Sequence, residues 1–190
     1  YVEKASHLII GNCTLHDCGN GQFIGAYDGQ TEDILIEGNH IYDNGIVGSF
    51  YEHISYTAAI YITFQFNHYG PLREGADGLV VRYNWIESGN RQLDLVDAKD
   101  SEVLVNHPKY NTTHVYGNIL IEPEGAGNSQ IAHYGGDSGT LDDYRKGDLY
   151  FYNNTVISTR SGNTTLIRLS SNDEIAHLFN NVIYNEINGS

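Results

Sequence analysis

The stretch Ile34-Leu35-Ile36-Glu37-Gly38-Asn39-His40-Ile41 decides the fold of this chain. The alternating apolar residues Ile34 and Ile36 predict a strand with one buried face. Asn39 then turns the chain, because asparagine tolerates the left-handed backbone conformation and its amide bonds to the local backbone. Ile41 begins a second short strand that faces the same interior.

The same pattern recurs along the chain: an apolar residue, two residues, Asn, one residue and another apolar residue. The other copies are Ile10-Cys13-Leu15, Val81-Asn84-Ile86, Val115-Asn118-Leu120, Phe151-Asn154-Val156 and Leu178-Asn181-Ile183. Successive turn positions are 26, 45, 34, 36 and 27 residues apart. The longest interval has room for two coils, the second with a degenerate motif between Tyr61 and Asn67. Stacked coils would let the turn asparagines bond to one another in a ladder.

A second column of short strands follows the motifs. Its members are 22–24, 92–95, 130–133 and 165–168, preceded by Asn20, Asn90, Asn128 and Asn163. Together the two columns predict an all-β, right-handed, single-stranded parallel β-helix of about six or seven coils over residues 1–190. A β-sandwich also uses short strands, but it does not require Asn at one fixed offset. We expect an uncapped segment of a longer secreted protein: either the caps lie outside this segment, or its coil ends stack on themselves or on a partner.

Composition excludes some classes of function. Hydrophobic residues make up 40% of the chain and charged residues 18%, and no apolar run is long enough to insert into a membrane. The formal net charge of −14 opposes nucleic-acid binding. It is compatible with Ca²⁺, and with acidic polysaccharides where local cationic pockets occur. Cys13 and Cys18 allow either a disulfide or two buried thiols.

The repeat resembles the right-handed parallel β-helix superfamily that includes pectate lyases, alginate and chondroitin lyases, polygalacturonases and phage tailspikes. Further segments are similar to a group of bacterial β-helix proteins labelled as polysaccharide-degrading. These segments are Glu52-His53 with Tyr56-Thr57, Gln65-Phe66-Asn67 with Gly70-Pro71, Arg82 to Glu87, Asn90 to Asp97, and His133 to Asp137. The resemblance implies export and a connection with carbohydrate, without an assigned substrate.

The best candidate catalytic residues lie in the second strand column. Asp94, His133 and Arg168 occupy near-equivalent places on three coils, so they are expected to line up in space. In a polysaccharide lyase, Arg91 or Arg168 would neutralise the uronate, His133 would be the base and Tyr134 the acid. In a glycoside hydrolase, three aspartates would supply the carboxylates. These are Asp94, Asp97 and Asp137. Outward Asp and Arg side chains also form solvated ladders that have no such role.

Other residues form weaker candidates. A second candidate set of base, acid and group that neutralises the uronate consists of His53, Tyr56 and Arg82. Trp85 is either a sugar-stacking platform or a packed loop contact. An acidic loop region supplies candidate Ca²⁺ ligands. These are Asp137, Asp142 and Asp143.

Two functions remain open from the sequence. The first is a secreted lyase or hydrolase that acts on an acidic polysaccharide. The second is a non-catalytic extracellular β-solenoid that binds carbohydrate, adheres or forms filaments.

Overall fold

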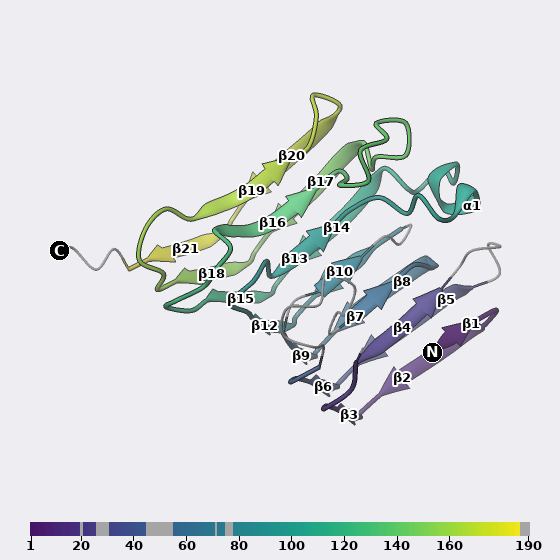
Figure 1. The fold of residues 1–190 in the computed structure, drawn as a ribbon, viewed down its shortest axis with the longest axis horizontal. Coiled ribbons are helices and arrows are strands. Elements are labelled where there is room, and N and C mark those ends of the chain that lie inside the picture. Colours follow the sequence, from purple (N-terminus) through teal and green to yellow (C-terminus); the bar gives the residue numbers. More distant parts are fainter. Residues whose placement is uncertain (20, 26–30, 45–54, 71, 75–77, 187–190) are drawn as a thin grey trace.

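The computed structural model describes residues 1–19, 21–25, 31–44, 55–70, 72–74 and 78–186 (Figure 1). Within these residues the regular structure consists of 21 strands and one short helix, α1, at Glu102–Val105. The fold is therefore all-β, as the sequence predicts.

The strands form three seven-stranded sheets. Sheet A contains β1 (Val2–Glu3), β4 (Gln22–Gly25), β7 (Ser55–Thr57), β10 (Leu72–Glu74), β13 (Leu93–Leu95), β16 (Gln130–Tyr134) and β19 (Thr165–Leu169). Sheet B contains β2 (Ser6–Gly11), β5 (Glu32–Glu37), β8 (Ile60–Gln65), β11 (Val80–Arg82), β14 (Thr112–Tyr116), β17 (Gly147–Tyr152) and β20 (Glu174–Phe179). Sheet C contains β3 (Thr14–Leu15), β6 (His40–Ile41), β9 (His68–Tyr69), β12 (Trp85–Glu87), β15 (Ile119–Glu122), β18 (Thr155–Ser158) and β21 (Val182–Asn185).

The chain visits sheets A, B and C in a fixed rotation, so each strand pairs with the strands three places before and after it. We call three consecutive strands, one from each sheet, a rung. Figure 1 shows the rungs following one another in chain order from the N-terminus to the C-terminus. The strand pairings in the described residues are all parallel, which argues against a β-sandwich. The arrangement is compatible with a β-helix or solenoid.

The core lies between the sheets and is built from rows of equivalent apolar residues. In sheet B one such row places Ile36 beside Phe64, then Val81, Val115 and Phe151, and these five side chains are fully buried. Each contributes roughly 1.5–3 kcal/mol through burial. The alternation seen in the sequence therefore separates inward from outward side chains.

The predicted asparagine ladder is present at the turn between sheets B and C. The side-chain oxygen of each asparagine accepts bonds from the backbone N–H and the side-chain amide of the asparagine one rung earlier. The Nδ2–Oδ1 distances are 3.0 Å for each step from Asn39 to Asn154 and 3.2 Å for the last step, to Asn181. Each amide also donates to a backbone carbonyl of the preceding rung, as Asn67 does to Ile36 at 2.9 Å. The ladder thus satisfies buried polar groups that would otherwise be costly.

The degenerate coil inferred between Tyr61 and Asn67 is confirmed. Asn67 continues the ladder, and the apolar motif positions are taken by Phe64 and Tyr69, both buried. The first copy departs from the pattern, because Cys13 lacks an amide and only its backbone N–H reaches Asn39 Oδ1 at 2.9 Å. Cys13 and Cys18 are free and exposed, so the structure shows neither a disulfide nor buried thiols.

The connection between β13 and β14 carries α1 and packs against the side of the rungs. Ser101 caps this short helix by accepting a hydrogen bond from the Leu104 backbone. Tyr110 is buried, accepts from the Ala98 N–H at 2.8 Å and donates to the Asp143 carbonyl at 3.0 Å. Tyr110 thereby joins this connection to the one between β16 and β17, and both lie beside the polar residues of sheet A.

Candidate functional site

The predicted alignment of candidate catalytic residues on sheet A is present. Asp94 on β13 pairs in register with His133 on β16, and His133 pairs with Arg168 on β19. We call these three residues the polar row. Asp94 alternates with the buried Leu93 and Leu95, so it lies on the opposite face of its strand from the core.

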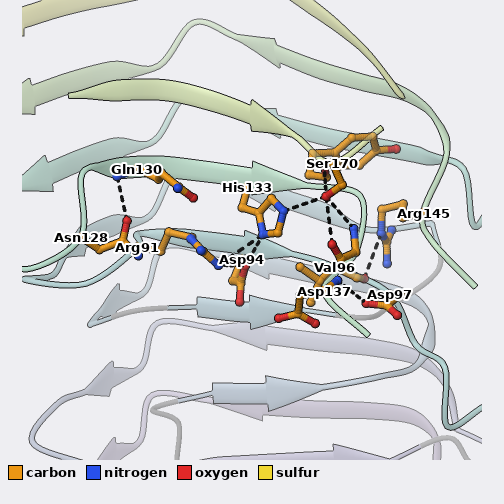
Figure 2. A network of polar contacts seen from close by, with 12 residues as sticks. Arg91, Asp94, Val96, Asp97, Asn128, Gln130, His133, Asp137, Arg145 and Ser170 are labelled. Carbon is orange, nitrogen blue, oxygen red and sulfur yellow. Dashed lines mark hydrogen bonds and ion pairs between the residues drawn. The ribbon is translucent and has the colours of Figure 1, made fainter. Parts of the chain in front are cut away.

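A compact hydrogen-bonded cluster forms in this row (Figure 2). Arg91 Nη1 donates to Asp94 Oδ1 at 2.6 Å and lies 3.2 Å from His133 Nδ1. His133 Nδ1 is in turn 3.1 Å from Asp94 Oδ1, and His133 Nε2 is 2.8 Å from Ser170 Oγ. Only 3% of the His133 side chain is exposed, against 15% for Asp94 and 20% for Arg91.

Two tautomers of His133 fit these contacts. If Nδ1 carries the proton, it donates to Asp94, and Nε2 can accept from the Ser170 hydroxyl. If Nε2 carries the proton, it donates to Ser170, and Nδ1 can accept from Arg91. The first tautomer leaves a histidine poised to receive a proton, and the second makes the cluster a structural network.

Two other predicted members, Arg168 and Tyr134, make no hydrogen bond to His133 in the described part of the chain and differ in burial. Arg168 is exposed, in keeping with a charge that meets a ligand. Tyr134 is the next residue after His133 and pairs with the buried Leu95, and it is itself fully buried. Its hydroxyl donates to the Lys146 carbonyl at 3.1 Å, and burial raises its pKa to about 12. Tyr134 therefore faces the core, so it is not placed to act as the acid of the candidate site.

The predicted carboxylates Asp97 and Asp137 differ in burial. Asp97 is buried, and its Oδ1 accepts the Asp137 backbone N–H at 3.0 Å, while its Oδ2 has no hydrogen-bond partner among the residues that the structure describes. Asp137 is exposed. In the described residues no group of three His, Cys, Asp or Glu side chains is arranged to hold a metal ion. The structure does not bring Asp137, Asp142 and Asp143 together as the sequence suggested for Ca²⁺.

The second predicted set is divided between sheets. Tyr56 lies on β7 of sheet A, whereas Arg82 lies on β11 of sheet B. Arg82 donates from Nε to Gln65 Oε1 at 2.8 Å and from Nη1 to the Tyr116 hydroxyl at 2.9 Å. His53 lies outside the described residues.

An open groove of about 670 Å³ lies over the asparagine ladder, on the outside of the turn between sheets B and C. We call it the aromatic groove. Its lining residues are Gly38, Asn39, His40, Phe66, Asn67, His68, Tyr83, Asn84, Trp85, Gly117 and Ile119. Grooves with apolar and aromatic walls and a few fixed polar groups are the usual form of ligand sites.

One wall of the aromatic groove consists of aromatic residues in an unusual backbone conformation. Phe66 and Tyr83 both have φ of +56°, at a turn position that other rungs fill with Gly38, Gly117 or Asn153. Their side chains are 61% and 48% exposed, and their rings stack with centroids 5.5 Å apart. A left-handed conformation costs a bulky residue about 1–2 kcal/mol. Strain of this kind is concentrated at functional sites.

Glycine at position 117 makes room for this wall. Gly117 has φ of +67°, and a Cβ placed on it would lie 2.5 Å from the Tyr83 ring. The neighbouring turn is therefore shaped to accept the ring of Tyr83.

The opposite wall is a row on sheet C, in which His40, His68 and Trp85 pair in register. The His40 and His68 rings stack at 4.7 Å, and His68 meets Trp85 edge to face at 6.0 Å. Trp85 is 41% exposed. Burial, and then the neighbouring His40, lower the pKa of His68, so its ring is neutral at neutral pH.

No protein-family model matches the chain, and neither a curated protein nor a solved structure shows significant similarity to it. The superfamily resemblance and its implied chemistry thus remain proposals. Among the residues that the structure describes, no helix is long and apolar enough to cross a membrane.

Sequence reasoning missed Ser170 and most of the aromatic groove. Ser170 follows its strand directly and belongs to no repeated motif. Phe66 and Tyr83 carried a usable signal, because each stands immediately before a turn asparagine, where other copies have Gly38 or Gly117. Of the groove residues only Trp85 was singled out, and the structure places it beside other rings.

Proposed function

We propose that this chain is a right-handed, single-stranded parallel β-helix that binds carbohydrate through its aromatic groove. The rotation of strands through three parallel sheets supports the β-helix. One observation carries the binding function: Phe66 and Tyr83 are held in a strained conformation and exposed opposite the row of His40, His68 and Trp85.

The chemistry of the groove suits a sugar chain. The faces of pyranose rings carry C–H groups that pack on aromatic rings, while their hydroxyls bond to polar groups at the ring edge. Aromatic rings form both walls, and the imidazoles of His40 and His68 offer polar atoms. The groove spans several rungs, which suits an extended chain better than a single compact ligand.

The lining also favours one class of polysaccharide. None of the described lining residues is Lys, Arg, Asp or Glu, and the whole chain has a formal charge of −14. The lining therefore offers no Lys or Arg to offset repulsion of a polyanion, and the lowered pKa of His68 keeps that ring neutral at neutral pH. Neutral polysaccharides are therefore its preferred ligands at neutral pH, and acidic ones bind more weakly.

The test is a binding panel at pH 7.5. Neutral glucans, xylans and mannans and acidic alginate, pectin and glycosaminoglycans would be compared by affinity gel electrophoresis and titration calorimetry. We expect at least one neutral polysaccharide to bind and the Trp85→Ala variant to lose more than about tenfold in affinity. A Trp at a binding centre commonly contributes at least 2 kcal/mol. Absence of binding across the panel would refute the proposal.

The matched control removes an aromatic residue elsewhere. Phe179 on β20 is 46% exposed and stacks on Tyr152, but it does not line the groove. The Phe179→Ala variant should bind as the unaltered protein does.

A second candidate function is depolymerisation of an acidic polysaccharide at the polar row. The register that places His133 between Asp94 and the exposed Arg168 favours it. Arg168 would neutralise a uronate carboxylate, while the burial of His133 restricts its access to a C5 proton. Absorbance at about 235 nm and reducing-end assays with alginate and pectin test this function. Loss of product in Arg168→Ala would support it, and no product from any acidic polymer would exclude it.

Both functions place the protein outside the cell, where polysaccharides are found, and secretion is part of the proposal. Self-stacking through the outermost strands stays a prediction.

A further inference from the structure

We infer that Asp94, His133 and Ser170 form a nucleophilic triad that hydrolyses carboxylic esters, such as O-acyl groups carried by a polysaccharide. The three residues come from consecutive rungs and are 39 and 37 positions apart in the sequence. Strand pairing places Asp94 beside His133, and the turn after β19 brings Ser170 to the same imidazole (Figure 2).

The distances meet the geometric requirements of such a triad. The nucleophile and base are in contact, with Ser170 Oγ 2.8 Å from His133 Nε2. The base and its orienting carboxylate are in contact too, with His133 Nδ1 3.1 Å from Asp94 Oδ1. Triads are recognised by these contacts and roles rather than by fold or sequence order.

The three residues differ in burial, and the nucleophile is less buried than the base and its carboxylate. His133 and Asp94 are shielded, with 3% and 15% of their side chains exposed, whereas Ser170 is only half-buried. A shielded histidine keeps its orientation and excludes water, and the half-buried position of Ser170 puts it nearer the surface than its two partners.

The surrounding backbone is shaped around the hydroxyl of Ser170. A Cβ on Gly135 would lie 2.6 Å from both Cβ and Oγ of Ser170, and Gly135 has φ of +128°. The Gly136 N–H donates to Ser170 Oγ at 3.0 Å. The hydroxyl proton has competing acceptors in the carbonyls of Gly136 at 3.0 Å and Tyr134 at 3.4 Å. His133 Nε2 is the nearest of the three.

Arg91 affects which histidine tautomer is favoured. Its Nη1 donates to Asp94 Oδ1 at 2.6 Å, and this bond fixes the carboxylate beside Nδ1. The Asp94 carboxylate favours the proton on Nδ1, which leaves Nε2 free to accept from Ser170, whereas the direct approach of Arg91 Nη1 to Nδ1 at 3.2 Å favours the other tautomer. Arg91 is therefore a positioning residue, one step removed from the reacting atoms.

The reaction balances with water as the second reactant. Ser170 Oγ attacks the ester carbonyl carbon and its proton passes to His133 Nε2. The bond from that carbon to the alcohol oxygen breaks, and His133 returns the proton to the leaving alcohol. Water then attacks the acyl-serine, gives one proton to His133 and releases the carboxylic acid. The proton finally returns to Ser170.

The first experiment is covalent labelling of the folded protein with an alkyl fluorophosphonate, followed by peptide mass spectrometry. We expect one adduct, on Ser170, and labelling slowed by at least about a hundredfold in His133→Gln and Asp94→Asn. Circular dichroism spectra would confirm that both variants fold. An unlabelled Ser170, or labelling unaffected by His133→Gln, would overturn the triad.

The second experiment measures hydrolysis of p-nitrophenyl acetate. Ser170→Ala should reduce the rate to that of buffer. Ser138→Ala should leave it unchanged, because the Ser138 hydroxyl accepts from the Thr140 N–H within its own loop and makes no hydrogen bond to the triad among the described residues. Equal rates in the two variants would refute the inference. Neither experiment uses the aromatic groove, so failure here leaves carbohydrate binding standing.

Discussion

Replacing Phe66 and Tyr83 by asparagine separates the functional role of the aromatic wall from a structural one. Asparagine is the residue that other rungs use at this turn, as at Asn153 with φ of +55°. The substitution therefore relieves about 1–2 kcal/mol of backbone strain at each position. It also removes the stacking of the two rings, which contributes about 0.5–1.5 kcal/mol.

These opposing terms nearly cancel. We expect Phe66→Asn and Tyr83→Asn each to change the free energy of unfolding by less than about 1 kcal/mol. Affinity for the polysaccharide identified in the panel should fall by more than about tenfold, because the ring that meets the sugar is gone. Urea unfolding followed by circular dichroism gives the first quantity, and titration calorimetry gives the second.

The control is Phe179→Asn, which removes a ring stacked on Tyr152 at 4.8 Å from an extended strand. It gains nothing from strain relief and should lose about 1 kcal/mol or more of stability. If the groove variants lose about 2 kcal/mol or more of stability while binding persists, the rings are structural. That result would refute the reasoning.

Three further predictions concern the ladder, the groove and its histidines. Asn118→Ala should lower the free energy of unfolding, measured with urea, by about 3 kcal/mol or more, because the buried Asn84 N–H and Val81 carbonyl lose their partners. A loss below about 1 kcal/mol would contradict the ladder's role. Gly117→Ala should destabilise the protein, because position 117 has a positive φ and the new Cβ would clash with the Tyr83 ring. The loss of unfolding free energy should be smaller when Gly117→Ala is combined with Tyr83→Asn. Equal losses in both backgrounds would show that the ring is not the obstacle. The lowered pKa of His68 means that the unfolded chain binds the proton more readily, so stability should decline as the pH falls below about 6.5. Unfolding measured at pH 7.5 and pH 5 should show a smaller decline in His68→Gln, and an identical decline would assign the effect to other groups.

The repeat could be predicted because its physical cause is local. An asparagine between two short apolar strands can be recognised in a single copy of the motif. The ladder from Asn39 to Asn181 follows when the copies stack. The alignment of Asp94, His133 and Arg168 also followed from the repeat. The strands β7 and β10 did not, because they carry no Asn-led motif.

The functional residues were harder to foresee for a related reason. Phe66 and Tyr83 stand out only through their positive φ, at the turn position where other rungs have glycine or asparagine. In the sequence they are visible only as exceptions to that preference. Ser170 lies outside every motif, and its contact with His133 depends on a turn after β19. The inward orientation of Tyr134 depends on strand register, which a shift of one residue would reverse.

The asparagine ladder gives the stack a direction. The side-chain oxygen of each asparagine faces the preceding rung, and one of its amide N–H groups bonds to the asparagine of the following rung, so these bonds all run in one direction along the axis. Aligned amides polarise one another, and a gap in the middle weakens the members on both sides. Two such stacks could continue the series only tail to head, because an inverted neighbour would set oxygen against oxygen.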